Sequence, residues 1–269
     1  MHCILLLSDR SREPTKRFLD RFGAVFPNAD TSQRNWTVMR EPRACAFGPL
    51  SWEQWRWHVL IDLHGMPPEV ERIVAGTFAH DATRALIQEH QMAVMLFLMS
   101  GPEEASPLDQ LRSLCKVAWC WFDVGADVFI WPRGQVSWRA SEIRHLSPEN
   151  LDHDDILYFT SYGVAGDGEG GQYWRSWGLG AFGLPDLVCV VRNAEDQQIA
   201  DVLFRSLIPY VMQLGGPLRD GDEVELPSPT ENGQSSAWRV AQAPQLESLH
   251  FLRSPYGVQL LTRADQPIG

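Results

Sequence analysis

One short segment of the first half, HVLIDLH, carries side chains of the kinds that bind metal ions. Strand alternation places His58, Asp62 and His64 on one face of this segment. Two imidazoles and one carboxylate are ligands that Zn²⁺ accepts, so one hypothesis is a metal-dependent hydrolase that uses these residues. The exposed face of a half-buried strand produces the same pattern more often. Because no second ligand cluster completes the site, we predict no metal and no other cofactor.

A second motif with possible chemistry is G-x-G-x-x-G at Gly178, Gly180 and Gly183. A dinucleotide site needs a helix directly after these glycines, because the helix N-terminus holds the pyrophosphate. Here a Leu-Pro-Asp turn and the β-branched run 188–191 follow the third glycine. We therefore predict a turn between two strands and no nucleotide site.

Ser113 and Lys116 match the Ser-x-x-Lys spacing of penicillin-recognising enzymes. The partner motifs of those enzymes are absent, and the two residues lie on a predicted amphipathic helix whose Cys115 faces the core. The match is better explained by chance.

The glycine-rich segment 165–171 lacks the Gly-Lys-Ser/Thr ending of a phosphate loop and is expected to be a hairpin tip. With no convincing catalytic constellation, we predict that the protein is not an enzyme.

The elements that must position these residues alternate between helices and strands without a regular βαβ order. Residues 106–122 are the strongest helix prediction of the first half, because Ser106 is a helix cap and Asp109 follows three residues later. The other expected elements are a helix from Pro14, two helices within 68–91, and strands at 2–8, 35–40, 43–48, 54–64, 92–100 and 127–132.

In the second half, the clearest helix spans 193–217, and Pro209 inside it predicts a kink or a break. The other expected elements are a short helix around 139–146 and strands at 156–164, 172–182, 186–191, 236–242, 248–252 and 257–262. This order predicts an α+β protein with two closely joined halves, residues 1–134 and 135–269, each a mostly antiparallel sheet with helices packed on it.

The net charge of −11 is concentrated in the second half, since residues 135–269 hold 18 acidic and nine basic residues. Such a field repels nucleic acid and anionic membranes and speeds encounter with a basic partner. We expect no direct contact with nucleic acid or membranes.

The five scattered cysteines and the short apolar N-terminal run fit a protein of the reducing cytoplasm.

Four stretches carry a resemblance to known proteins: FDVGADVFIWP (122–132), YFTSYG (158–163), SWGLGAFGLPDLVCVV (176–191) and LGGPLRDGDEVEL (214–226). They resemble a bacterial family of stand-alone domains of unknown function with a Gly-Leu-Pro-Asp-Leu core, similar to type VI secretion immunity proteins. The resemblance covers roughly residues 115–226. It implies a protein that binds a cognate toxin, such as a nuclease effector, and masks its active site. It carries over no catalytic residues.

A nuclease toxin presents a basic active-site groove, which an acidic surface with aromatic anchors would complement. The candidate partner-binding residues are acids and aromatic residues of the second half. They are Asp152, Asp154, Asp155, Asp167, Glu169, Tyr173, Trp174, Asp220, Asp222, Glu223 and Glu225. Exposed aromatic residues also favour self-association, so a homodimer is a further possibility.

Overall fold

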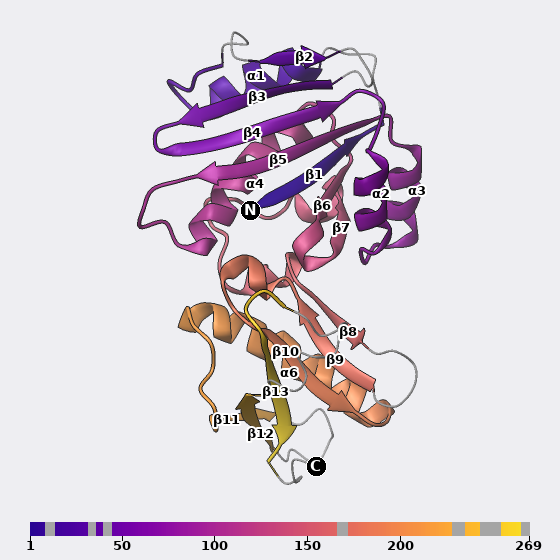
Figure 1. Cartoon of the computed structure of the whole chain (residues 1–269), viewed down its shortest axis with the longest axis vertical. Helices are drawn as coiled ribbons and strands as arrows, with labels where there is room; N and C mark the ends of the chain where they lie inside the picture. The colour runs from indigo at the N-terminus through magenta and orange to yellow at the C-terminus, as the bar shows by residue number, and fades with distance from the viewer. Residues whose placement is uncertain are drawn as a thin grey trace. The chain divides into compact units, whose positions relative to one another are not determined.

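The chain folds as two units, Met1–Leu151 and Asp152–Gly269, each built on its own sheet (Figure 1). The computed structural model describes residues 1–8, 14–31, 36–39, 45–165, 172–227, 235–242 and 254–264. Both sheets are mostly antiparallel and have helices packed on them, so the predicted α+β class is confirmed. Among the described residues, no helix has the length and apolar character needed to cross a membrane.

Seven strands make the sheet of unit 1, in the order β2-β3-β4-β5-β1-β6-β7, with every neighbouring pair antiparallel. The strands are β1 (His2–Leu7), β2 (Thr37–Met39), β3 (Cys45–Trp52), β4 (Trp55–Asp62), β5 (Met92–Ser100), β6 (Val128–Trp131) and β7 (Val136–Arg139). The apolar run of β1 lies between β5 and β6, where Ile4 is opposite Met95 on one side and Ile130 on the other. A strand covered on both faces needs such an uninterrupted apolar sequence.

Helices cover both faces of this sheet, as the alternation along β6 shows. The Phe129 ring contacts the Trp119 ring of α4 (Pro107–Asp123) at 6.2 Å between centroids. Its neighbours Val128 and Ile130 pack with Val74 of α2 (Pro68–Ala75) on the other face. The remaining helical segments of unit 1 are α1 (Pro14–Val25), which packs on α4, α3 (Asp81–Glu89), α5 (Ala140–Ile143) and the 3-10 turn η2 (Pro132–Gly134).

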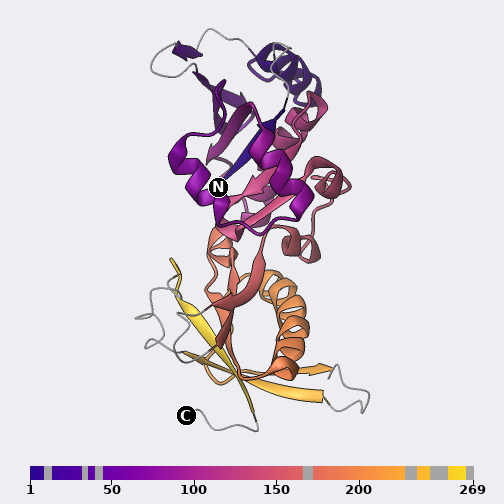
Figure 2. The same ribbon diagram turned by 90° about the vertical axis from the view of Figure 1, so that its right-hand side faces the viewer.

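Unit 2 holds a six-stranded sheet in the order β11-β12-β13-β10-β9-β8, in which only β10 and β13 are parallel. Its strands are β8 (Ser161–Ala165), β9 (Gln172–Trp177), β10 (Asp186–Val191), β11 (Glu223–Pro227), β12 (Ser235–Gln242) and β13 (Val258–Arg263). The long helix α6 (Ala194–Leu214) lies along one face (Figure 2). On this face the Phe204 ring lies 6.4 Å from that of Trp174 and 5.7 Å from that of Tyr162.

The N-terminus of α4 is closed by the hydrogen bonds that the sequence predicts. The Ser106 hydroxyl accepts a hydrogen bond from the Asp109 backbone N–H at 3.1 Å, and the Asp109 carboxylate accepts one from the Ser106 N–H at 3.1 Å. These hydrogen bonds satisfy two donors that a helix end leaves open. The hydrogen bond from the Ser106 hydroxyl also lowers the pKa of Asp109.

Three of the expected elements in unit 2 differ in the structure. The predicted strand 156–164 is a 3-10 turn, η3 (Asp154–Tyr158), followed by β8, because the Asp152 side chain before the turn accepts hydrogen bonds from its first two backbone N–H groups. The predicted strand 172–182 ends at Trp177, and η4 (Leu179–Phe182) follows. Helix α6 continues through Pro209, so the alternative of a break there is wrong.

Other segments extend or lie outside the expected organisation. Strand β11 was not expected in the acidic tail, although Val224 and Leu226 alternate there with glutamates. Strand β7 pairs with β6, so residues directly after the expected boundary at 134 join the first sheet, and unit 1 extends to Leu151. The predicted strand 248–252 lies outside the described residues.

Candidate partner-binding surface

Acidic residues are concentrated in unit 2, which holds 16 acidic and seven basic residues. Unit 1 holds 18 and 16, so almost all of the net charge belongs to unit 2. The predicted partner-binding acids that the structure describes fall into two groups, one at the start of η3 and one at β11. Asp167 and Glu169 lie outside the described residues.

The group at β11 forms the edge of the second sheet. The Asp222 carboxylate accepts a hydrogen bond from the Arg219 N–H at 2.7 Å and closes a turn, in which Gly221 has the positive φ of 86°. Glu223 and Glu225 follow on β11 with exposed side chains. Edge position and side-chain alternation thus leave both glutamates at the surface. We call Asp220, Asp222, Glu223 and Glu225 the acidic edge.

Local partners differ among these acids. Glu223 forms an ion pair with Arg239 on β12 at 2.6 Å, with both side chains about half exposed. Such surface pairs contribute only about 0–1 kcal/mol, so this one does little to hold the strand. The Glu225 side chain accepts no hydrogen bond from the described residues. The acidic edge therefore keeps carboxylate oxygen atoms available to a partner.

The group at the start of η3 has a structural role of its own. One Asp152 carboxylate oxygen accepts hydrogen bonds from the backbone N–H groups of Asp154 at 2.9 Å and Asp155 at 3.2 Å. The Asp155 carboxylate accepts one from the Asp152 N–H at 3.1 Å. Two of the three predicted acids thus start the turn η3, and the Asp154 side chain is exposed beside them.

The two predicted aromatic anchors lie on opposite faces of β9. Trp174 points toward α6, where its ring lies 6.4 Å from that of Phe204. Tyr173 packs against Val188 and Leu260 on the other face. Both side chains are half-buried, so their main contacts are within unit 2.

The glycine motif forms the turn between β9 and β10, as predicted from the absence of a following helix. Gly178 and Gly183 have φ values of 111° and 76° and flank η4, so each occupies a left-handed conformation that favours glycine. The Asp186 carboxylate, at the start of β10, pairs with the Arg175 guanidinium at 2.8 Å. Both side chains are almost fully buried, and burial raises the pKa of Asp186 although Arg175 opposes the rise.

The hypothesis of a metal site at β4 finds only part of its geometry. His58 and His64 are exposed, but Asp62 is only 4% exposed and its carboxylate accepts a hydrogen bond from the His64 N–H at 2.9 Å. The expectation of an exposed strand face therefore fails at Asp62, which closes a turn at the end of the strand. Within the described ranges, no three His, Cys, Asp or Glu side chains form a group suited to a metal ion.

Comparisons with known proteins add no relative: no family model, no curated protein and no solved structure matches this chain.

Proposed function

We propose that this protein is an immunity protein that binds a basic protein toxin, a nuclease effector of type VI secretion, and masks its active site. The observation that carries the proposal is the acidic edge of unit 2, within a unit that holds 16 acidic and seven basic residues. A nuclease active site binds the phosphate backbone through basic residues, so an acidic protein surface is its electrostatic complement.

The negative electrostatic field of unit 2 attracts a basic partner before the two proteins are in contact. Charged surfaces of opposite sign raise association rates by about ten- to a thousandfold at low salt. Screening over about 8 Å at physiological ionic strength makes this gain depend on salt. Masking by the acidic edge therefore predicts fast, salt-sensitive association with the toxin.

The first experiment tests toxicity and binding together. The product of the gene beside this one is expressed in a sensitive bacterium with and without this protein, and the complex is isolated from the surviving cells. We expect rescue of growth and a stable complex of the two chains. Continued killing in the presence of folded protein, with no complex formed, would contradict the function.

A second experiment locates the binding surface. Asp220, Glu223 and Glu225 are changed together to lysine, and Asp222 is kept because its carboxylate closes the turn. The matched control changes three exposed acids of unit 1, Asp20, Glu89 and Glu103, to lysine. Stopped-flow association with the purified toxin should slow about tenfold or more, with a smaller salt slope, only in the first variant. Equal effects of the two variants would assign the steering to net charge and not to this edge.

A further inference from the structure

A pocket of about 350 Å³ opens in unit 1, far along the chain from the acidic edge. It is lined by the β3–β4 hairpin, by the segment 102–105 and by one side of α4. Ligand pockets have volumes of about 300–1,000 Å³, so this one has room for a single small molecule.

One wall of the pocket consists of aromatic rings held in place. Trp52 and Phe26 meet edge to face at 5.1 Å, and the Trp52 indole N–H donates a hydrogen bond to the Pro27 carbonyl at 3.2 Å. The Trp55 ring covers Gly101 so closely that a Cβ atom there would lie 2.3 Å from it. These fixed rings offer flat apolar surface to a planar ligand.

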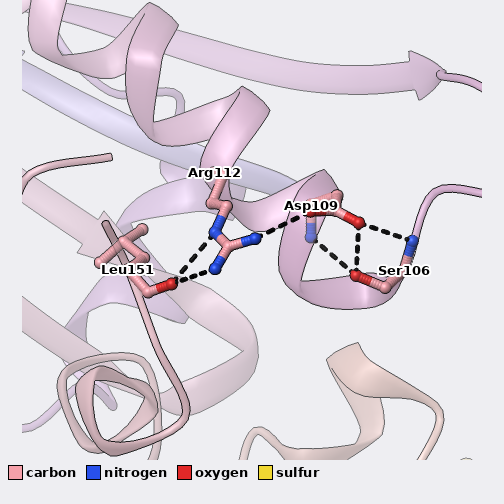
Figure 3. A network of polar contacts seen from close by, with 4 residues as sticks. All are labelled: Ser106, Asp109, Arg112 and Leu151. Atoms are coloured by element: carbon pink, nitrogen blue, oxygen red, sulfur yellow. Dashed lines mark hydrogen bonds and ion pairs between the residues drawn. The ribbon is translucent and has the colours of Figure 1, made fainter. Parts of the chain in front are cut away.

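The part of the lining that belongs to α4 carries hydrogen-bond donors. Three of the five Arg112 N–H groups are bound, one to Asp109 at 3.0 Å and two to the Leu151 carbonyl (Figure 3). The other two have no partner among the described residues. The Lys116 ammonium lies one helical turn further on and meets the Glu149 carboxylate at 3.6 Å, a long contact that leaves other donors open.

Ser113 lies between these two cations on the same wall. The side chain is 6% exposed, and its hydroxyl has no hydrogen-bond partner among the described residues. A buried hydroxyl without a partner is destabilising, so a ligand that bonds to it would relieve that cost. Ser113 and Lys116 are three residues apart, but the Ser113 hydroxyl and the Lys116 ammonium do not bond to each other. The two residues therefore do not form a nucleophile and its base.

We propose that this pocket binds a small aromatic monocarboxylate, with its ring against Trp52 and Trp55 and its carboxylate bound by Arg112 and Lys116. Donors predominate on the α4 wall, because its one carboxylate, that of Asp109, already accepts hydrogen bonds from Ser106 and Arg112. The Glu104 carboxylate in the lining disfavours more highly charged anions such as phosphates. A planar acid with one negative charge fits both walls.

Calorimetry on the full chain tests the ligand class with three probes of the same shape: phenylacetate, neutral phenylacetamide and cationic phenethylamine. Phenylacetate should bind about tenfold more tightly than the amide, since charge-assisted hydrogen bonds to Arg112 and Lys116 are lost with the charge. Phenethylamine should bind most weakly. Tighter binding of phenethylamine would assign the pocket to cations held by the rings and Glu104, and equal binding of all three would exclude recognition of the carboxylate.

A pair of lysine variants places the binding. Lys116→Met should weaken phenylacetate binding about tenfold and leave phenylacetamide unchanged. Lys16→Met is the matched control, because Lys16 is exposed on α1, outside the pocket, and is the only other lysine of the chain. Should Lys116→Met unfold the chain, Ser113→Ala provides a second test, with a weaker loss expected, larger for phenylacetate than for phenylacetamide because a hydrogen bond to a charged acceptor is stronger. Phenylacetate binding unchanged in a folded Lys116 or Ser113 variant would overturn the proposal.

Discussion

The buried pair of Arg175 and Asp186 allows a stability prediction with a worked magnitude. Each side chain is about 5–6% exposed, and the charged atoms lie 2.8 Å apart. Replacing Arg175 by Met leaves the Asp186 carboxylate in the interior without that cation. Breaking a buried pair in this way costs about 3–5 kcal/mol, a large part of the 5–15 kcal/mol that holds a typical protein folded. We therefore expect Arg175→Met to unfold much of unit 2 under mild denaturation.

Hydrogen exchange measured by mass spectrometry can assign the loss of stability to one unit. Peptides from β9 and β10 report on unit 2, and peptides from β1 and β5 report on unit 1. The double variant Arg175→Met with Asp186→Leu should recover most of the lost protection, since no charge then remains buried. As a control, Arg239→Met removes an ion pair that is about half exposed and should cost less than about 1 kcal/mol.

For Arg175→Met we also predict how the unfolding free energy depends on pH. Burial already raises the pKa of Asp186, and loss of the Arg175 charge raises it further. The folded state then binds more protons than the unfolded state between the raised value and the ordinary value of 3.8. Unfolding free energy must therefore rise as pH falls through this window. A loss below about 1 kcal/mol at neutral pH, or stability that falls at lower pH relative to the parent, would refute the account of this pair.

Three further changes have definite expected outcomes. Ser106→Ala removes the cap of α4 and should lower the unfolding free energy by about 1 kcal/mol in urea denaturation. Gly183→Ala forces a side chain onto φ 76° and should cost about 1 kcal/mol or more, whereas Gly76→Ala, at φ −84°, should be neutral or stabilising in the same assay. Iodoacetamide should label the half-buried Cys45 well before the buried Cys189, because burial raises the pKa of Cys189 to about 12; faster labelling of Cys189 in the mass spectrum would contradict this.

Local patterns predicted those elements whose signals lie within a few residues. The cap of α4 needs only Ser106 and Asp109, and both hydrogen bonds are present. The turn between β9 and β10 was predictable because a strand, and no helix, follows Gly183. Where side chains compete with the ladder, the same reasoning failed. The Asp152 carboxylate accepts hydrogen bonds from the backbone N–H groups of Asp154 and Asp155 and so starts a turn that runs into a segment whose apolar pattern is typical of a strand.

The pocket of unit 1 was beyond any local pattern, because its walls come from separate parts of the chain. Trp52 and Trp55 belong to a hairpin, Phe26 follows α1, and Arg112 and Lys116 lie on α4. Periodicity identifies the stripe of α4 that faces the sheet, but not which element covers the stripe beside it. The Ser-x-x-Lys match did coincide with the polar wall of this pocket. It suggested a serine nucleophile with a lysine base, but Lys116 contacts Glu149 and not the Ser113 hydroxyl.

The acidic edge shows why a count of charges and a list of contacts describe different properties. A carboxylate that closes a turn, such as that of Asp222, keeps its charge and so contributes to the field felt by an approaching partner. One of its two oxygen atoms is already bound to the backbone, so it offers less to a partner in contact than Glu225 does. Association rates should therefore depend on all acids of unit 2, and dissociation rates on the few whose oxygen atoms are available. Sequence alone gives the first set, and only the hydrogen bonds of the folded chain identify the second.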